Sequence, residues 1–443
     1  MSTDKPNDWV ARSLRSVWHP CTQMQHHESV PLIPVSHGRG VWLYDHDGKR
    51  YLDAISSWWV NLFGHGHPHI TAALKDQLDT LSHVMLAGCT HAPVVELSER
   101  LAALTGLGHA FYGSDGASAT EIALKMSAHY WRNVGRPEKS RFIGLAHGYH
   151  GETVGALSVT DIELFREAYG PLVRLSATVP SPDARGAAAG VSAAEHARDC
   201  AQALQRHLEA HHATTAALVL EPLVQCANGM AMHDPEYLRQ ARALCDRYQV
   251  HLIADEIAVG FGRTGSLFAH QQAGIQPDFI CLSKGLTGGT LALSAVLCTD
   301  AVFDAFYDDS TARGFLHSHS YTGNPLACRA ALATLELFEQ GDVLARNRET
   351  AAQLSAFATP LTHHPRVLRS RQLGMIWAFD IDIDTDTDDP TFSRRYHAAA
   401  LQRGLLLRPI GNTLYFMPPY VIDREACQWL AEGALAALEE VLA

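Results

Sequence analysis

The sequence predicts an α/β protein whose large domain holds a mainly parallel sheet sandwiched between helices. From about residue 70 to residue 335, short apolar runs alternate with helical patterns, as in chains that build a parallel sheet covered on both faces. The chain has 443 residues, more than one hydrophobic core usually holds, so we expect two lobes. Hydrophobic residues make up 47% of the chain, which suits a large core.

The expected elements follow from apolar runs and their periodicity. The strands are predicted at 109–112, 141–145, 216–220, 250–255, 279–283 and 293–298. The helices are predicted at 93–104, 118–133, 235–248 and 324–339. Residues 41–53 read as a hairpin around an Asp-Gly turn, and the stretch 181–196, rich in Pro, Gly, Ala and Ser, reads as a loop.

Composition excludes several classes of protein. The net charge of −12 argues against a general nucleic-acid surface. No apolar run is long enough to span a membrane, and the first residues lack the apolar core of a signal peptide. The nine cysteines include no CxxC pair and predict reduced thiols in the cytoplasm. His65, His67 and His69 occupy a loop broken by Gly and Pro, so we expect no metal site there.

Two charged residues end neighbouring strands in this pattern. Lys284 ends the run Phe279-Ile280-Cys281-Leu282-Ser283, and Asp255 ends the run from Val250. Strand ends of this kind meet in one crevice at the carboxyl edge of an α/β sheet. Pyridoxal phosphate (PLP) needs such a pair, because a lysine holds its aldehyde as a Schiff base and an aspartate keeps its pyridine nitrogen protonated. A surface lysine beside a turn is the alternative for Lys284 alone.

Three further segments could contribute to the same site as this pair. Gly113–Glu121 places small residues at a predicted helix start, where backbone N–H groups bind phosphate, although an ordinary N-cap fits equally well. Tyr149 follows a strand and could stack on a planar ring or be a rim tyrosine. Arg408 follows an apolar run and suits bidentate binding of a carboxylate, or a surface salt bridge.

The run Gly260-Phe261-Gly262-Arg263-Thr264-Gly265 matches the pattern GxGxxG of dinucleotide-binding loops. That fingerprint needs glycines that open a helix and an acidic residue about 20 positions later. Here the acidic residues Asp255 and Glu256 precede the glycines, and a weak helix opening follows them. A nicotinamide-dependent oxidoreductase is therefore only a remote alternative.

Taken in order, these segments resemble the class III (ornithine-type) aminotransferases of PLP fold type I, from about residue 15 to residue 425. The resemblance implies an N-terminal arm and part of a small α+β domain in 1–65, a large PLP-binding domain in 66–335, and the rest of the small domain in 336–443. It is closer to the branch that converts 8-amino-7-oxononanoate to 7,8-diaminononanoate in biotin synthesis. That closeness is carried by His19-Pro20-Cys21, Ser56-Ser57-Trp58-Trp59, Gly148-Tyr149-His150-Gly151, Thr322-Gly323-Asn324-Pro325, Arg408-Pro409-Ile410-Gly411 and Met417-Pro418-Pro419-Tyr420.

The resemblance also implies roles for single residues. Lys284, Asp255 and Tyr149 would be catalytic, with Lys284 as the Schiff-base lysine and proton shuttle. Cofactor contacts would come from Gly116, Ala117, Tyr149, Asp255, Ile257, Lys284, His319 and Ser320. His319 and Ser320 would reach the phosphate from the partner subunit, so a homodimer with a shared active site is expected. Cys21, Trp58, Tyr149, Lys284, the Ser318 backbone and Arg408 would contact substrate.

Several positions depart from the family pattern. Cys21 stands where many members have a tyrosine, and Ala117 replaces a serine, leaving only its backbone N–H. Glu221–Gly229 lacks the second glutamate that many ornithine-type relatives use to neutralise the substrate arginine, so a glutamate-type donor is not expected. S-adenosylmethionine is the expected amino donor, and lysine is the alternative. Another ω-aminotransferase, acting on a diamine or β-amino acid, is the second alternative.

Overall fold

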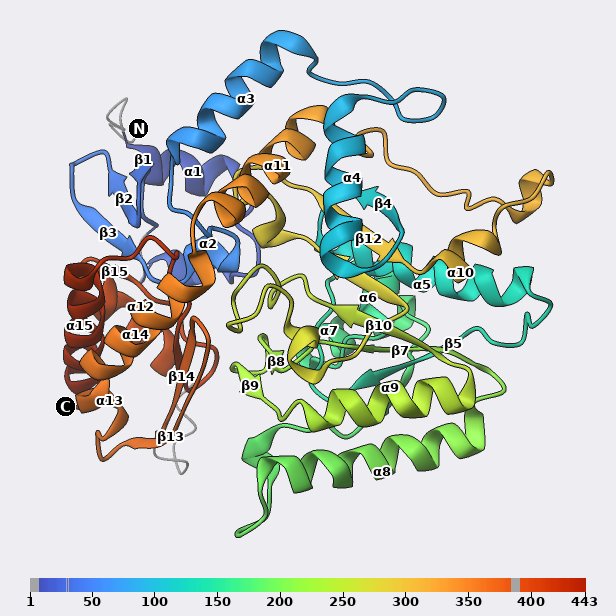
Figure 1. The fold of residues 1–443 in the computed structure, drawn as a ribbon. Helices are drawn as coiled ribbons and strands as arrows, with labels where there is room; N and C mark the ends of the chain where they lie inside the picture. Colours follow the sequence, from blue (N-terminus) through green and yellow to red (C-terminus); the bar gives the residue numbers. More distant parts are fainter. Residues whose placement is uncertain (1–7, 29, 31, 384–390) are drawn as a thin grey trace.

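The computed structural model describes residues 8–28, 30, 32–383 and 391–443. Its central element is a seven-stranded sheet in the order β4-β12-β11-β10-β7-β5-β6 (Figure 1). All neighbouring strands are parallel except those that pair with β12, which runs antiparallel to both β4 and β11. The strands are β4 (His109–Gly113), β5 (Arg141–Leu145), β6 (Ala177–Val179), β7 (Thr215–Leu220), β10 (His251–Asp255), β11 (Phe279–Leu282) and β12 (Ser294–Cys298). The predicted mainly parallel α/β sheet is confirmed.

Alternate residues of the central strands belong to two different hydrophobic clusters. On β7, Leu218 belongs to one hydrophobic cluster and Val219 to another, and β10 divides in the same way between Leu252 and Ile253. Because successive side chains of a strand point to opposite faces, the two clusters lie on opposite faces of the sheet. Both faces are thus buried, which explains why these strands read as unbroken apolar runs.

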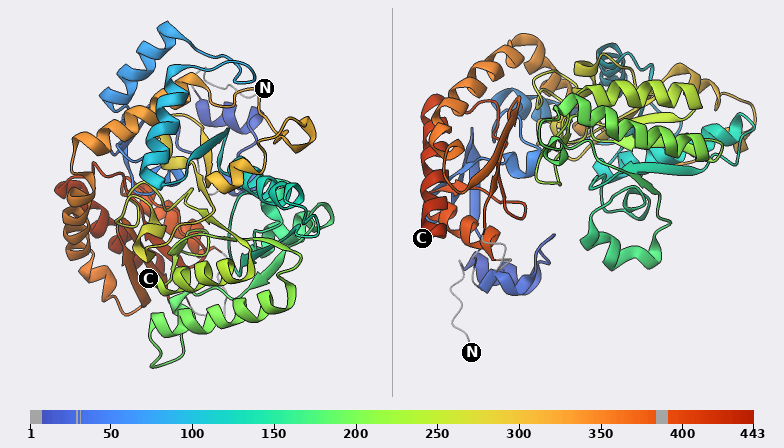
Figure 2. Two further views of the ribbon diagram at one scale, coloured as in Figure 1. Left: turned by 45° about the vertical axis from the view of Figure 1, so that its right-hand side comes forward. Right: turned by 90° about the horizontal axis from the view of Figure 1, so that it is seen from below.

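Helices supply the other half of each core. Helix α5 (Gly116–Asn133) packs on strands β4, β7, β10, β11 and β12 and fills one cluster. Helices α8 (Ala193–His211) and α9 (Glu236–Tyr248) lie side by side and contribute to the other (Figures 1 and 2). The remaining helices of this region are α3 (Pro68–Thr80), α4 (Ala92–Thr105), α6 (Val154–Leu157), α7 (Glu163–Tyr169), α10 (Asp300–Asp304) and α11 (Pro325–Gln340).

The two ends of the chain meet in a second, smaller group of elements. Strands β1 (Val35–Arg39), β2 (Trp42–Asp45) and β3 (Arg50–Asp53) form one sheet with the late strand β15 (Leu405–Leu406), which runs parallel to β3. A three-stranded sheet, β13-β14-β16, completes this group with strands β13 (Val367–Leu373), β14 (Ile376–Ile381) and β16 (Thr413–Phe416). Figure 2 shows these early and late segments gathered on one side of the molecule.

The remaining elements are short or belong to the same group. They are α1 (Trp9–Ser16), α2 (Ser56–Trp59), α12 (Val343–Phe357), α13 (Thr359–Thr362), α14 (Phe392–Gln402), α15 (Arg424–Leu442) and a two-stranded ribbon of β8 (Val224–Gln225) and β9 (Ala231–Met232). The domain boundaries at 65 and 335 stay a prediction. Among the described helices, none combines the length and apolar character that crossing a membrane requires.

One predicted boundary is wrong. The loop expected over 181–196 ends earlier, because α8 begins at Ala193. The cause is a capping box: the Ser192 hydroxyl accepts from the N–H of Glu195, and the Glu195 carboxylate accepts from the N–H of Ser192. The Ser-x-x-Glu pattern that signals this helix start was present in the sequence.

Candidate active site

A cavity of about 800 Å³ opens at the carboxyl edge of the central sheet. It collects residues that follow the ends of β5, β7, β10 and β11, as sheets of this topology place their ligands. The predicted residues that line it are Cys21, Trp58, Gly116, Ala117, Tyr149, Asp255, Ile257, Lys284 and Arg408. We call this space the active-site cavity.

Ser318, His319 and Ser320 do not line this cavity in the single chain. Nδ1 of His319 lies 2.9 Å from the Ser114 hydroxyl, just before helix α5. Ser318 and Ser320 are exposed on the same loop. Their predicted contribution across a subunit interface stays a prediction.

At the deep end of the cavity, Asp255 is held by two hydrogen bonds. Its Oδ1 accepts from the N–H of Ile257 at 3.0 Å, and its Oδ2 accepts from Nδ1 of His150 at 2.6 Å. Asp255 and His150 are both buried. Burial alone would lower the pKa of His150, but the bond to Asp255 outweighs it and raises that pKa. These two hydrogen bonds therefore fix the position of the Asp255 carboxyl group.

Glu221 is a second buried carboxyl group beside this pair. It accepts from the N–H groups of Tyr149 and Cys226, and so joins two loops that enter the cavity. Burial raises the pKa of Glu221 to about 7, and the like charge of Asp255 adds to the effect. His150 and Glu221 both stand in segments that the sequence analysis singled out, but sequence reasoning assigned a role to neither side chain.

Lys284 has an unusual setting for a lysine. It begins a short 3₁₀ helix, and its backbone φ is 43°. Its Nζ lies 5.1 Å from the centre of the Trp59 ring. Burial lowers the pKa of the Lys284 ammonium, although Asp255, Cys226 and Glu221 oppose the shift. A larger fraction of neutral amine, the nucleophilic and basic form, follows.

The start of helix α5 forms a cradle for an anion. The N–H groups of Gly116 and Ala117 stand in the first turn, where no intrahelical partner exists, and the Asp115 side chain caps Ser118 instead. A Cβ at Gly116 would lie 3.0 Å from Cγ2 of Ile257, so glycine leaves the space between them open. With a lysine, a buried aspartate and an apolar ring contact from Ile257, this donor set fits PLP.

The side chains in the outer part of the active-site cavity are more exposed than those at its deep end. The Tyr149 hydroxyl donates to Oε1 of Glu152 at 2.9 Å, and Sγ of Cys21 lies 3.7 Å from the same oxygen. Nη2 of Arg408 donates to the Cys21 carbonyl at 3.0 Å, and its guanidinium lies 5.2 Å from the centre of the Trp58 ring. In the part of the chain that the structure describes, Arg408 forms no ion pair, which leaves its charge available to a ligand.

Trp58 projects from a left-handed turn. Ser56, Ser57, Trp58 and Trp59 all have positive φ, between 47° and 72°. Such residues cost about 1–2 kcal/mol each and persist only where their surroundings hold them. Here Ser57 donates from its N–H and its hydroxyl to Asp53, and the Ser56 hydroxyl donates to the Met417 carbonyl.

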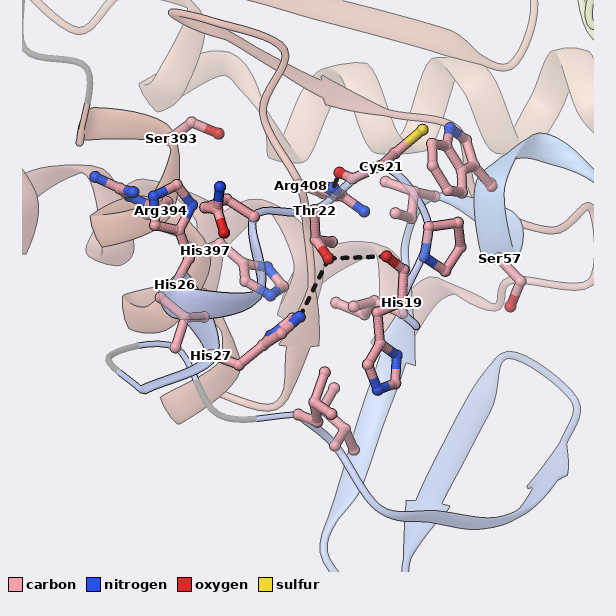
Figure 3. Close-up of a pocket in the computed structure, with 18 of the residues that line it drawn as sticks. His19, Cys21, Thr22, His26, His27, Ser57, Ser393, Arg394, His397 and Arg408 are labelled. Atoms are coloured by element: carbon pink, nitrogen blue, oxygen red, sulfur yellow. Dashed lines mark hydrogen bonds between the residues drawn. The ribbon is translucent and has the colours of Figure 1, made fainter. Parts of the chain in front are cut away.

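A second cavity of about 650 Å³ adjoins the first at Cys21, Trp58, Arg408 and Tyr415. Figure 3 shows its polar lining, in which the Thr22 hydroxyl bonds to His27 and to the His19 carbonyl. Its described lining includes Arg394, Arg408 and His397 but no acidic residue. The basic end of the active site thus continues into a space that favours anions.

The GxGxxG run has a structural use. It is followed by turns and a 3₁₀ helix, Ala269–Ala273, and no α-helix begins at its glycines. Arg263 within it is buried and donates to the carbonyls of Pro418 and Asn61. The run therefore ties the large sheet to the C-terminal segment, and the geometry lacks the helix that a dinucleotide site needs.

The fold and the cavity define a transaminase of PLP fold type I, and the chain belongs to the aminotransferase class-III family, whose model matches residues 23–438. A relative from Helicobacter pylori (strain ATCC 700392 / 26695), named adenosylmethionine-8-amino-7-oxononanoate aminotransferase, is 43% identical over 98% of both chains.

Solved structures agree with this family. The crystal structure of the adenosylmethionine-8-amino-7-oxononanoate aminotransferase from Methanocaldococcus jannaschii DSM 2661 matches with a TM-score of 0.91 and 33% identity, over 97% of this chain and 98% of that one. An amine transaminase from an uncultivated Pseudomonas species, solved in its PLP-bound form, matches with a TM-score of 0.91 and 30% identity, over 96% and 99%.

Proposed function

We propose that this protein transfers an amino group to 8-amino-7-oxononanoate, giving 7,8-diaminononanoate for biotin biosynthesis, with PLP as cofactor and S-adenosylmethionine as donor. The observation that carries the proposal is one cavity with Lys284 and Asp255 at its deep end and, nearer its mouth, Arg408, which forms no ion pair with any described residue. The names of relatives at 43% and 33% identity support the choice of substrate.

The residues that would hold the cofactor follow from the geometry above. The N–H groups of Gly116 and Ala117 would bind the phosphate, Ile257 and Tyr149 would contact the ring, and Asp255 would accept from its nitrogen. When bound, PLP supplies an aldehyde that captures amines and a ring that takes up electrons.

The phosphate site would be completed from the partner subunit. His319 contacts Ser114, which lies just before the phosphate cradle at the start of α5, and neither His319 nor Ser320 lines the cavity of its own chain. A second copy of this chain would bring its own loop to that edge, so we expect a homodimer.

Lys284 would move the proton in both half-reactions. Burial favours its neutral amine, so Nζ can accept a proton from the donor carbon. The same atom, now an ammonium close to Asp255 and Glu221, can return the proton to the acceptor. Asp255 would act by charge: His150 and the Ile257 N–H hold its carboxylate in place, where it would stabilise a positive ring nitrogen.

Arg408 would bind the carboxylate of the keto acid. Among the described residues, it makes one side-chain hydrogen bond, to the Cys21 carbonyl, and the adjoining cavity, whose described lining holds no acidic residue, leaves room for an anionic tail. Glu152 also lines the active-site cavity, 3.7 Å from Sγ of Cys21, and would attract the cationic end of either substrate.

Two alternatives use the same machinery. Lysine could replace S-adenosylmethionine as donor, because both carry an α-amino acid group and a distant cation. A general amine transaminase is the second alternative, and it is supported by the likeness to the Pseudomonas amine transaminase and by the absence of the usual tyrosine at Cys21.

The decisive experiment is a single turnover with purified enzyme carrying the aminated cofactor. We expect stoichiometric conversion of 8-amino-7-oxononanoate to 7,8-diaminononanoate, measured by mass spectrometry. S-adenosylmethionine, lysine and a simple amine, supplied separately, should then differ in how fast they restore the aminated form. Conversion of simple ketones but not of 8-amino-7-oxononanoate would contradict the proposed substrate.

A further inference from the structure

A third cavity, of about 670 Å³, lies at the opposite edge of the central sheet. It is lined by residues at the amino ends of β5, β6 and β7, whereas the active-site residues follow the carboxyl ends of their strands. We call it the rear cavity. Its volume falls within the range of small-molecule sites.

The rear cavity is basic, although the chain carries a net charge of −12. Its lining, as far as the structure describes the chain, contains Arg141, Arg174, His207 and His211, and no Asp or Glu. Hydroxyl groups accompany them, from Ser140, Ser158, Ser176, Thr214 and Thr215. Cations and hydroxyl donors without a carboxylate are the groups that recognise an anion.

These basic side chains are not used within the fold. In the described part of the chain, neither guanidinium, of Arg141 or of Arg174, has a hydrogen bond or an ion pair. The rings of His207 and His211 lie 4.8 Å apart, and burial together with His211 lowers the pKa of His207. Two guanidinium cations and two imidazoles thus offer hydrogen-bond donors to an anion without competition from a carboxylate of the described lining.

One wall of the same cavity is apolar. Phe142 and Val154 line it together with Leu172 and Leu175, whose exposed fractions are 68% and 45%. Large apolar side chains left open beside basic groups favour a ligand that has both a charged head and an apolar part.

A single segment borders both the rear cavity and the active-site cavity. Within residues 152–176, Glu152, Thr153, Ile162 and Phe165 line the active-site cavity. Val154, Gly155, Ser158, Leu172, Arg174, Leu175 and Ser176 of the same segment line the rear cavity. A ligand that fixes one part of this segment therefore restricts the part that borders the active site.

We propose that the rear cavity binds a small organic anion, a carboxylate or phosphate ester with an apolar tail, and thereby orders the 152–176 segment beside the active site. The anionic head lies between Arg141 and Arg174, and the tail packs on the leucines. Binding needs no substrate or donor, so the proposal is independent of the substrate assigned above.

The test is calorimetric titration of the PLP-loaded protein with octanoate and with octyl phosphate, which distinguishes a carboxylate head from a phosphate head. Acetate and inorganic phosphate serve as heads without a tail. At least one of the tailed anions should bind, and more tightly than its tail-less head. Arg141→Ala/Arg174→Ala should weaken binding at least about 10-fold, because it removes both charged donors that bind the anionic head.

Two control variants locate the binding. Arg206→Ala removes an exposed arginine of α8 that does not line the cavity, and it should leave affinity unchanged. Arg408→Ala should also leave it unchanged, which separates the rear cavity from the substrate arginine. The proposal is overturned if neither tailed anion binds, if the tail adds nothing, or if the double variant binds as the wild type does.

Hydrogen exchange tests the coupling. The tailed anion should slow amide exchange in residues 152–176 of the wild type and leave it unchanged in the double variant. Unchanged exchange in that segment at saturating anion would refute the proposed link to the active site. Melting temperatures of the variants, expected to match the wild type because both arginines are exposed, show that the fold is intact.

Discussion

The deep and outer parts of the active-site cavity are built differently. The deep part holds Asp255, His150 and Glu221 in buried hydrogen bonds. The outer part presents Cys21 and Arg408 on exposed segments with few contacts. The departure at Cys21 lies in the outer part. Burial thus fixes the groups that carry the proton chemistry, while the exposed rim leaves room to change the substrate.

The largest effect should come from Lys284→Ala at the deep end. Loss of the proton carrier is expected to lower kcat by more than about 10³-fold. Reduction with borohydride should fix the cofactor covalently to the wild type but not to the variant, as measured by intact mass. Near-normal turnover in the variant would contradict the assignment of Lys284 as the proton carrier.

Asp255→Asn should have the next largest effect. The amide keeps the shape but loses the charge that balances a ring cation, so kcat should fall about 10²- to 10³-fold. Asp255→Glu, which keeps the charge, is the matched control and should retain more activity. Equal losses in both variants would indicate that geometry rather than charge matters at this position.

Arg408→Leu should act through KM at the outer part. Losing a charged hydrogen bond of about 1.5–3 kcal/mol predicts a KM for the keto acid raised roughly 10- to 150-fold. The kcat should change little, since no proton moves at Arg408. Steady-state kinetics would contradict the division between the two parts if kcat fell while KM stayed constant.

Glu221 gives the deep part a pH signature in stability. Its pKa is about 7 in the fold and near 4.5 in the unfolded chain, so the folded state binds the proton more tightly. Stability from this group is complete below about pH 4.5 and is lost as the pH rises through about 7. Glu221→Gln should therefore lose less melting temperature between pH 5 and pH 8 than the wild type does. If the melting temperatures of Glu221→Gln and the wild type change equally with pH, the raised pKa of Glu221 is contradicted.

Cys21→Tyr should have the smallest effect. A tyrosine hydroxyl adds one net hydrogen bond at most, of about 0.5–1.5 kcal/mol, so KM for one substrate should fall about 2- to 10-fold. Cys21→Phe adds the ring without the hydroxyl and is the control. If both variants behave alike, ring packing rather than the hydroxyl controls this part of the rim.

Much of the fold could be predicted from local sequence. The apolar runs at 141–145 and 279–283 gave strands because both faces of the sheet are buried, so no alternation obscured them. The parallel pairing of Leu405 with Leu52 joins residues far apart in the chain and has no local signal. The start of α8 is hard to predict locally, because the stretch around it is rich in Pro, Gly, Ala and Ser. That composition indicates a loop more strongly than Ser192 alone indicates a helix N-cap.

The candidate active site likewise contains some residues with a local sequence signal and others without one. Lys284, Asp255 and Arg408 could be assigned because each ends a strand or carries a motif, and the fold brings them into one cavity. His150 bonds to Asp255 across 105 positions, which only the order of the strands brings about. Residues expected to act across subunits, such as His319, depend on a second chain that no pattern within one sequence specifies.

The left-handed turn at Trp58 limits which variants the substrate wall can accept. With a φ of 71°, glycine at position 58 would relieve about 1–2 kcal/mol of backbone cost, and asparagine is also tolerated there. Valine, isoleucine and threonine, branched at Cβ, are genuine outliers at such angles. Few substitutions at position 58 can therefore make room for bulkier substrates, whether by engineering or by natural mutation. The simplest is Trp58→Gly, which removes the side chain altogether.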